Sequence, residues 1–306
     1  MSPKSRVLII AGPTASGKTA LALRLAEVST KAGRRPTSII SADSRQVYQG
    51  LDVLTGKDIP AEKANLRLFG LDLIAPDQTM NAAQYSDYAR KVIALEIKEH
   101  RQVIIVGGTG FYLQALVGPA SLAAVAPNDR LRQELNRLPL GELQHRLKEI
   151  DAKRLAAMNQ SDVANPRRLI RAIEIALAPT RTVLVGGLGY EDSPCRFTWI
   201  GIRVPLTILK ERIAARVEAR LDAAVTEVQD LLAAYPDRSL PIYTSLGVAP
   251  ISRFLAGAIS RGEARQLWTT EEVQYAKRQL TWFAKQQQII WYDLDEVSKL
   301  NLDKLV

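Results

Sequence analysis

Cysteine and histidine are scarce in this 306-residue chain, which contains one cysteine, Cys195, and two histidines, His100 and His145. A single cysteine cannot form an internal disulfide bond, and these three side chains are too few for a four-ligand Cys/His zinc site. The sequence therefore excludes a disulfide-stapled scaffold and a zinc module. Any bound metal is expected to have oxygen ligands.

Long apolar runs are also missing. Runs such as Val103–Val106 are much shorter than the roughly 20 residues that a membrane-spanning helix needs. The first residues lead directly into a strand-like run at Arg6–Ala11, which leaves no room for the apolar region of a signal peptide. We therefore expect a cytoplasmic protein that does not enter a membrane, and we treat it as a monomer.

Basic residues exceed acidic ones, with 41 Lys and Arg against 32 Asp and Glu, a net charge of +9. An excess of this size is typical of proteins that bind a polyanion, and nucleic acid is the first candidate. The alternative is a solvated helical surface that happens to be basic. With 47% hydrophobic residues and 24% charged residues, the chain can bury a core, and its composition is not that of a disordered protein.

Short apolar runs alternate with helical patterns in the first third of the chain, which predicts an α/β fold with a parallel, doubly wound sheet and flanking helices. After Leu116 the pattern becomes helical, which predicts an inserted helical module. We divide the chain into residues 1–118 (first part of the core), 119–164 (insertion) and 165–306 (second part of the core). The predicted strands are 6–11, 38–41, 68–74, 102–106, 196–203 and 288–292, and the predicted helices of the core are 17–31, 81–99, 206–232 and 269–285.

Residues 12–19 read Gly-Pro-Thr-Ala-Ser-Gly-Lys-Thr and match the P-loop pattern without a mismatch, between a predicted strand and a predicted helix. Glycines let backbone N–H groups point at one anion, and the following helix N-terminus adds positive potential. Lys18 would neutralise phosphate oxygens, and Thr19 would ligate Mg²⁺. The alternative is a glycine-rich turn with an accidental lysine. The predicted phosphate-binding residues are Gly12, Pro13, Thr14, Ala15, Ser16, Gly17, Lys18 and Thr19.

NTP hydrolysis is not the chemistry that this P-loop favours. Hydrolytic P-loop proteins usually place a metal-binding carboxylate at the end of an apolar strand. Here the strand at 102–106 runs into Gly107-Gly108-Thr109-Gly110 instead. Asp72 is the other candidate for that position, and we interpret it as a structural or hydrogen-bonding residue at a strand end.

Asp43 follows the second predicted strand, next to the P-loop strand, and is expected to face the bound phosphate. A carboxylate there can accept a proton from a nucleophile that attacks the group attached to the phosphate. Gln46 can present a donor and an acceptor to the edge of a base. The alternative for Asp43 is a cap on the turn.

Five blocks of residues together resemble the tRNA dimethylallyltransferases over nearly the whole chain. The resemblance implies transfer of the dimethylallyl group of dimethylallyl diphosphate to N6 of the adenine immediately 3′ of the anticodon. The insertion and the C-terminal helices would then bind the tRNA anticodon stem-loop. The blocks are residues 12–19, 43–48 (Asp-Ser-Arg-Gln-Val-Tyr) with Asp52 and Thr55, 106–113 (Val-Gly-Gly-Thr-Gly-Phe-Tyr-Leu), 165–174 (Asn-Pro-Arg-Arg-Leu-Ile-Arg-Ala-Ile-Glu) and 275–282 (Tyr-Ala-Lys-Arg-Gln-Leu-Thr-Trp).

The resemblance also implies roles for single residues. Lys18, Thr19 and Thr109 would bind the diphosphate with Mg²⁺, and Asp43 would take the proton from the amine. Arg212 or Arg216 would supply a further cation to the diphosphate, which makes Asp43, Thr109, Arg212 and Arg216 the expected catalytic residues. The expected tRNA contacts are Ser44, Arg45, Gln46, Arg167, Arg168, Arg171, Lys277, Arg278, Gln279 and Trp282.

The chain departs from the family pattern at three places. Leu246–Pro250 stands in place of a Gly-Tyr-Lys segment, Leu54 stands in place of a glycine, and the stretch Leu68–Gly70 replaces the histidine that usually precedes the position of Asp72. The residues alone leave three other functions open. These are a small-molecule kinase, an enzyme that prenylates free adenylate, and a non-catalytic RNA-binding protein with a relic P-loop. The basic insertion favours an RNA acceptor over a small one.

Overall fold

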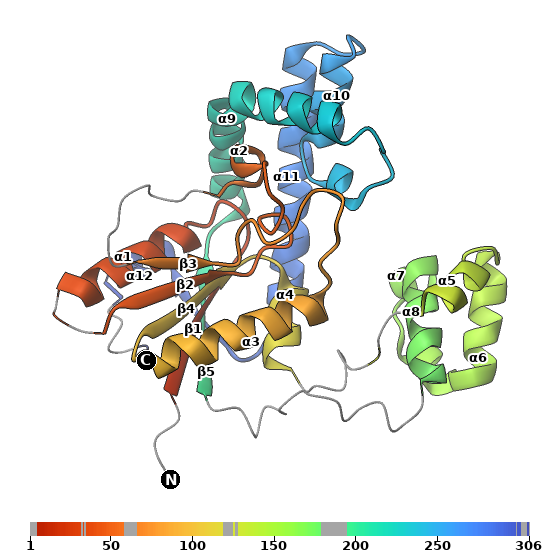
Figure 1. Cartoon of the computed structure of the whole chain (residues 1–306), viewed down its shortest axis with the longest axis horizontal. Helices are drawn as coiled ribbons and strands as arrows, with labels where there is room; N and C mark the ends of the chain where they lie inside the picture. Colours follow the sequence, from red (N-terminus) through yellow and green to blue (C-terminus); the bar gives the residue numbers. More distant parts are fainter. Residues whose placement is uncertain are drawn as a thin grey trace. The chain divides into compact units, whose positions relative to one another are not determined.

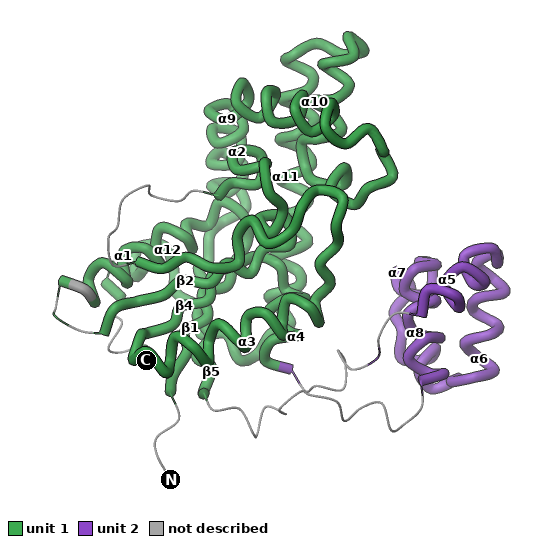
Figure 2. Tube along the Cα trace, viewed as in Figure 1, with its two compact units in different colours: residues 1–117, 193–306 green, residues 118–192 purple. Residues whose placement is uncertain are grey.

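The structure is a computed structural model of the chain, and it describes residues 5–31, 33, 35–57, 66–118, 125, 128–178, 195–297, 299, 300 and 305. The chain divides into two compact units. Residues 1–117 and 193–306 form the first unit, and residues 118–192 form the second (Figure 2).

A six-stranded sheet in which every neighbouring pair is parallel forms the centre of the first unit, with strand order β3-β2-β4-β1-β5-β6. This confirms the predicted α/β class. Residues Val7–Ala11 of the central strand have no exposed surface, as expected for a parallel strand covered on both faces. The strands are β1 (Ser5–Ala11), β2 (Thr37–Ser41), β3 (Arg67–Phe69), β4 (Gln102–Gly107), β5 (Cys195–Arg203) and β6 (Ile289–Asp293).

β3 is shorter than predicted and ends at Phe69 instead of residue 74. Gly70 turns the chain away with φ +84°, and Asp72 also has a positive φ, 52°. Both residues leave the extended region, so strand geometry cannot continue. Asp72 is therefore outside the strand, and its carboxylate binds Lys57.

Helices α1 (Lys18–Lys31) and α3 (Ala82–Lys98) cover opposite faces of the sheet. Ser38 of β2 donates a hydrogen bond to Glu96 of α3, whereas the next residue, Ile39, lines a cavity together with Leu23 of α1. Successive side chains of a strand point to opposite faces. This arrangement follows from right-handed crossovers, because β1 to β2 and β3 to β4 run in opposite directions along the sheet.

Helices α9 (Leu206–Ala234), α10 (Val248–Leu255) and α11 (Arg261–Phe283) of the first unit gather beyond the carboxyl ends of the strands (Figure 1). Ligands bind at that end of an open α/β sheet. The other described helices of this unit are α2 (Asp52–Thr55), α4 (Gly110–Val117), the 3₁₀ helix η4 (Pro241–Thr244) and α12 (Leu294–Val297).

Helix α11 begins at Arg261, eight residues before the predicted start at 269. Ser260 and Glu263 form a capping box, in which each side chain accepts from the other residue's backbone N–H. The hydroxyls of Thr269 and Thr270 donate back to carbonyls four residues earlier, inside the helix. The two threonines are therefore interior residues, and the prediction that they start the helix is wrong.

The second unit contains α5 (Asp129–Leu135), α6 (Leu140–Ala157), α7 (Gln160–Val163) and α8 (Pro166–Leu177). Its own apolar core includes Leu135 and Leu147 from the earlier helices and Leu169 and Ile173 from α8. The predicted insertion ended at residue 164, but α8 buries its apolar face against α6 and so belongs to this unit.

In the described part of the chain, every helix is too short or too polar to span a membrane.

Candidate functional site

The loop between β1 and α1 has the backbone of a phosphate cradle. Gly12, Ala15 and Gly17 all have positive φ, at 155°, 61° and 89°. These angles curl the chain just before α1 begins at Lys18. Gly12 and Gly17 adopt them without steric cost, whereas Ala15 is a non-glycine residue in the left-handed region. The Nζ atom of Lys18 donates to the carbonyl oxygen of Pro13 at 3.1 Å, which folds the lysine over the loop. Backbone N–H groups, a helix N-terminus and a lysine converge here, as anion binding requires.

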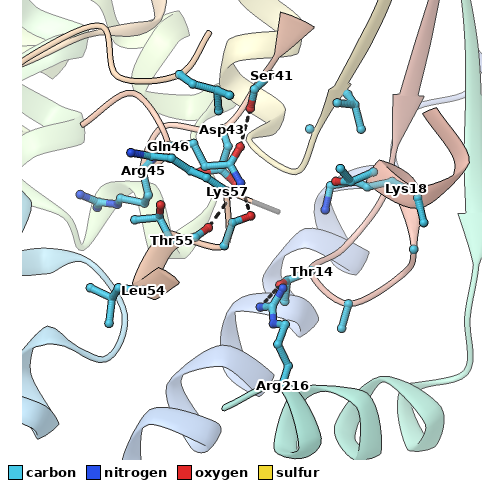
Figure 3. A pocket seen from close by; sticks show the side chains of 18 of the residues that line it. Thr14, Lys18, Ser41, Asp43, Arg45, Gln46, Leu54, Thr55, Lys57 and Arg216 are labelled. Atoms are coloured by element: carbon cyan, nitrogen blue, oxygen red, sulfur yellow. Dashed lines mark hydrogen bonds between the residues drawn. The ribbon is translucent and has the colours of Figure 1, made fainter. Parts of the chain in front are cut away.

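A cavity of about 450 Å³ opens beside this loop, at the carboxyl ends of the strands (Figure 3). It receives side chains from both halves of the core, which are far apart in the sequence. The predicted site residues that line it are Thr14, Ala15, Gly17, Lys18, Thr19, Asp43, Arg45, Gln46, Arg212, Arg216 and Gln279. Gly12, Pro13, Ser16 and Thr109 support the loops around the cavity without being part of its lining.

Arg212 and Arg216, one turn apart on α9, both contact the P-loop. Nη2 of Arg216 donates to the hydroxyl of Thr14 at 2.5 Å, and Nη1 of Arg212 donates to the carbonyl oxygen of Ala15 at 3.4 Å. The structure thus brings both arginines to the phosphate loop, where the sequence analysis expected cationic groups.

Helix α11 holds the same loop through two buried side chains, Glu272 and Gln279. Oε2 of Glu272 lies 3.0 Å from Nη2 of Arg216 and accepts from the hydroxyl of Thr14 at 3.4 Å. Gln279 accepts from the backbone N–H of Thr14 at 2.8 Å and donates to the carbonyl of Gly108 at 2.9 Å. Both amide atoms of Gln279 are therefore engaged within the protein, so we assign it to positioning the loops.

Asp43 projects into the cavity from the turn after β2 (Figure 3). Its Oδ1 atom accepts from the backbone N–H of Arg45 at 2.8 Å, and the hydroxyl of Thr109 accepts from the backbone N–H of Ser44 at 3.0 Å. These bonds fix the turn and the direction of the carboxylate. Among the described lining residues only Asp43 and Glu272 are acidic, and Glu272 is bound to Arg216. Asp43 is therefore the carboxylate placed to accept a proton.

Tyr275 lies beside Asp43 and is a lining residue that the sequence analysis did not single out. Burial and the nearby Asp43 carboxylate raise the pKa of Tyr275 to about 12, and a hydrogen bond with Thr109 opposes the rise. The phenol stays protonated at neutral pH and can act there as a hydrogen-bond donor. The sequence feature that could have identified Tyr275 is its spacing. Glu272, Tyr275 and Gln279 stand at i, i+3 and i+7, on one face of a helix.

The side chains of Arg45 and Gln46, which the sequence analysis expected to contact tRNA, form hydrogen bonds within the protein. The amide of Gln46 accepts from the hydroxyl of Ser41 at 2.6 Å and donates to the carbonyls of Thr55 and Gly56 at 3.3 and 2.8 Å. Arg45 donates to two groups of η4, at 3.2 and 2.9 Å. Contact of these two side chains with RNA stays a prediction.

Lys57 is a further residue of the cavity wall that the sequence analysis missed. Its side chain is fully buried, and its Nζ atom donates to the carbonyl of Tyr48 and to Asp52, each at 2.7 Å, and to Asp72. A buried lysine is stable only when its charge is paired and its donors are used. Lys57 thereby anchors the segment 48–57 that carries Gln46's carbonyl partners.

The other predicted RNA contacts are spread over both units. On α11, Lys277 and Arg278 are exposed, whereas Trp282 is half-buried against Gly110. On α8 of the second unit, Arg167 is exposed and Arg168 pairs with Asp162. Arg171 donates to Glu174 at 3.1 Å and to the carbonyl of Val125 at 2.8 Å, so its guanidinium belongs to the fold of this unit.

The donor atoms at the cavity are compatible with Mg²⁺. Thr19 and Asp43 offer a hydroxyl and a carboxylate, which are oxygen ligands of the kind that Mg²⁺ prefers. Within the described ranges there is no group of three or more His, Cys, Asp or Glu side chains that could hold a metal ion. The residues fit a Mg²⁺ ion that is bound through one or two protein oxygens and through substrate phosphates.

Comparison with known proteins gives one consistent result. Residues 46–286 match the family model described as IPP transferase. The chain is 35% identical to the tRNA dimethylallyltransferase of Geobacter metallireducens, over 95% of this chain and 93% of that protein. It is 33% identical to the enzyme of the same name from Moorella thermoacetica, over 96% and 92%.

Solved structures agree. The structure of the tRNA isopentenylpyrophosphate transferase of Bacillus halodurans matches with a TM-score of 0.66 at 29% identity, over 98% of this chain and 93% of that one. A eukaryotic dimethylallyltransferase acting on tRNA matches with a TM-score of 0.75 at 20% identity, over 94% and 74%. At that identity the second likeness speaks for the fold alone.

Proposed function

This chain belongs to the IPP transferase family, the tRNA dimethylallyltransferases, and we propose that dimethylallyl diphosphate is its donor and that it works as a monomer. The enzyme transfers a dimethylallyl group to an adenine of tRNA. We place the transfer at N6 of the adenine immediately 3′ of the anticodon. The observation that carries the proposal is that Asp43 and the P-loop face one cavity.

The P-loop would hold the diphosphate, which is the leaving group. As the bond between C1 of the prenyl group and oxygen breaks, the electron pair stays on the diphosphate. Lys18, Arg212 and the backbone N–H groups of the loop stabilise the growing negative charge. The hydroxyl of Thr19 would hold Mg²⁺, which would supply further positive charge to the diphosphate.

The exocyclic nitrogen of the adenine forms the new bond to C1 and must then lose a proton. Asp43 is fixed by the N–H of Arg45 and faces the cavity, so its carboxylate accepts this proton. Tyr275, protonated at neutral pH, can donate a hydrogen bond to the Asp43 carboxylate or to the base. Proton acceptance and diphosphate binding are thus divided between two loops at the ends of β2 and β1.

The target base has to leave the anticodon stack to reach this cavity, at a cost of a few kcal/mol. Exposed basic side chains offset that cost by binding the phosphates on either side. Lys277 and Arg278 of α11 are exposed and suited to this task. Trp282 would help indirectly, because its ring packs against Gly110 and supports the loop that ends at that glycine.

Mass spectrometry of nucleosides tests the proposal. An anticodon stem-loop with adenines after the anticodon is incubated with the protein, Mg²⁺ and dimethylallyl diphosphate. We expect one adenine to gain one C5H8 unit. Modification of free AMP in place of the RNA, or phosphate transfer from ATP, would contradict the proposal and favour a small acceptor. RNA binding should also weaken steeply with added salt, because each phosphate contact releases counterions.

A further inference from the structure

Glu272 places a negative charge inside a cavity that otherwise collects positive charge. Its side chain is 8% exposed, and its Oε2 atom lies 3.0 Å from Nη2 of Arg216. The same oxygen accepts from the hydroxyl of Thr14 at 3.4 Å. A buried carboxylate beside a site for a polyanion costs binding energy, so its presence calls for an explanation.

Arg212 provides the comparison. It stands one turn before Arg216 on α9 and also reaches the P-loop, but its contact is the neutral carbonyl of Ala15. Two arginines of one helix thus face the same loop, and of these two only Arg216 is paired with a buried carboxylate within the described part of the chain. The difference lies on α11, which places Glu272 against Arg216.

Holding the loop in place does not by itself account for a charged residue at position 272. Gln279, two turns further along α11, already binds the backbone N–H of Thr14 with a neutral side chain. The hydroxyl of Thr14 in turn accepts from Arg216 at 2.5 Å. A neutral acceptor at position 272 would satisfy the same donors.

We propose that Glu272 sets the affinity of the site for diphosphate. Its carboxylate pairs with Arg216 and lowers the positive potential at the P-loop, so that the product diphosphate is released. The proposal rests on the function above, in which diphosphate is the leaving group. A site with too much positive charge binds the leaving diphosphate as tightly as the transition state, and turnover is then limited by product release. Glu272 acts through Arg216 and is a positioning residue.

Glu272→Gln separates charge from shape, because glutamine keeps an oxygen acceptor of the same length. Binding of inorganic diphosphate with Mg²⁺ is measured by calorimetry on the full chain. We expect Glu272→Gln to bind diphosphate roughly tenfold more tightly, since a negative charge close to the anion is removed in a partly buried site. We also expect a burst of modified RNA followed by slower steady-state turnover.

Two further variants serve as controls. Glu272→Asp keeps the charge and should bind diphosphate much as the natural protein does. Glu211→Gln removes an exposed carboxylate next to Arg212 on α9 and should leave diphosphate binding and turnover unchanged. A loss of packing would weaken binding, so tighter binding in Glu272→Gln alone cannot come from a merely structural role.

The results separate this inference from the proposed function. If Glu272→Gln binds diphosphate equally or more weakly, with an unchanged melting temperature, the inference is overturned while the donor site stands. Weaker binding in both Glu272→Gln and Glu272→Asp would show that Glu272 only orients Arg216, which also overturns it. If the natural protein binds no diphosphate, the proposed function itself fails. Should Glu272→Gln not fold, Glu272→Ser allows the same comparison.

Discussion

The side chain of Gln279 accepts a hydrogen bond from the backbone N–H of Thr14 at 2.8 Å, across 265 positions of the sequence. Its amide nitrogen donates to the carbonyl of Gly108 at 2.9 Å. One side chain of α11 therefore connects the loops that follow β1 and β4. Gln279 is 4% exposed, so its partners are shielded from water by the same packing.

We expect Gln279→Leu to destabilise the protein and to weaken donor binding, because it leaves a buried N–H and a buried carbonyl without partners. Each such group costs about 1–3 kcal/mol, so the free energy of unfolding should fall by about 2–6 kcal/mol. Urea unfolding and the KM for dimethylallyl diphosphate measure the two effects. Gln274→Leu, at an exposed position of the same helix, is the control. Equal unfolding midpoints would show that the bridge does not hold the loops.

The ring of Trp282 leaves no room for a side chain at residue 110. A Cβ atom placed on Gly110 would lie 2.4 Å from the tryptophan ring, and one placed on Gly108 would lie 2.2 Å from the amide of Gln279. The glycines at 108 and 110 are thus explained by the close approach of α11 to this loop.

We predict that Gly110→Ala lowers the free energy of unfolding by about 1–3 kcal/mol, the usual cost of overpacking, and shifts the fluorescence of Trp282. Gly141→Ala is the matched control. Gly141 lies in α6 with no atom near its Cβ position, so alanine there should be neutral or stabilising by up to about 1 kcal/mol. Similar destabilisation in both variants would contradict a steric role for Gly110.

Local chemistry made much of this molecule predictable. The P-loop follows from the spacing of two glycines, a lysine and a threonine between a strand and a helix, and the structure has that order. The buried parallel strands follow from short apolar runs. Asp43 was predicted at the cavity because it follows a strand next to the P-loop strand, and the structure places it there.

Other features depend on partners that are distant in sequence. The role of Glu272 depends on its ion pair with Arg216. The burial of Lys57 depends on its ion pairs with Asp52 and Asp72. The start of α11 was misjudged because two threonines before two glutamates resemble a helix cap. The apolar face of α8 could be read from the sequence, but its partner helix could not.

Asp43→Asn should lose transfer activity while keeping the site intact. Asparagine retains an oxygen that can accept from the N–H of Arg45, so the turn is preserved, but it cannot take a proton. We expect kcat to fall by about 10²- to 10⁴-fold, with little change in the Kd for the donor or the stem-loop. Asp77→Asn, an exposed acid of the same unit, controls for loss of a charge. Unchanged turnover in Asp43→Asn would remove this residue from the mechanism.

Glu174 makes the stability of the second unit depend on pH. Burial of this carboxyl acts to raise its pKa, but hydrogen bonds from Arg132, from the N–H of Asn128 and from Arg171 outweigh it, so the pKa lies below the ordinary 4.5. Because the folded pKa is lower than the unfolded one, the network stabilises the fold above about pH 4.5. That stability is lost as the pH falls through the folded pKa.

Glu174→Gln should remove this dependence and lower stability at pH 7 by about 2 kcal/mol, because Arg132 loses its buried partner. All four tryptophans, at positions 199, 268, 282 and 291, lie in the first unit, so their fluorescence follows that unit while circular dichroism also follows the helices of the second. Thermal melts from pH 7 to pH 3, followed by both probes, therefore distinguish the unfolding of the two units. Glu149→Gln, exposed on α6, should keep the pH dependence of the natural protein. If Glu174→Gln keeps it too, the network does not control the acid stability of this unit.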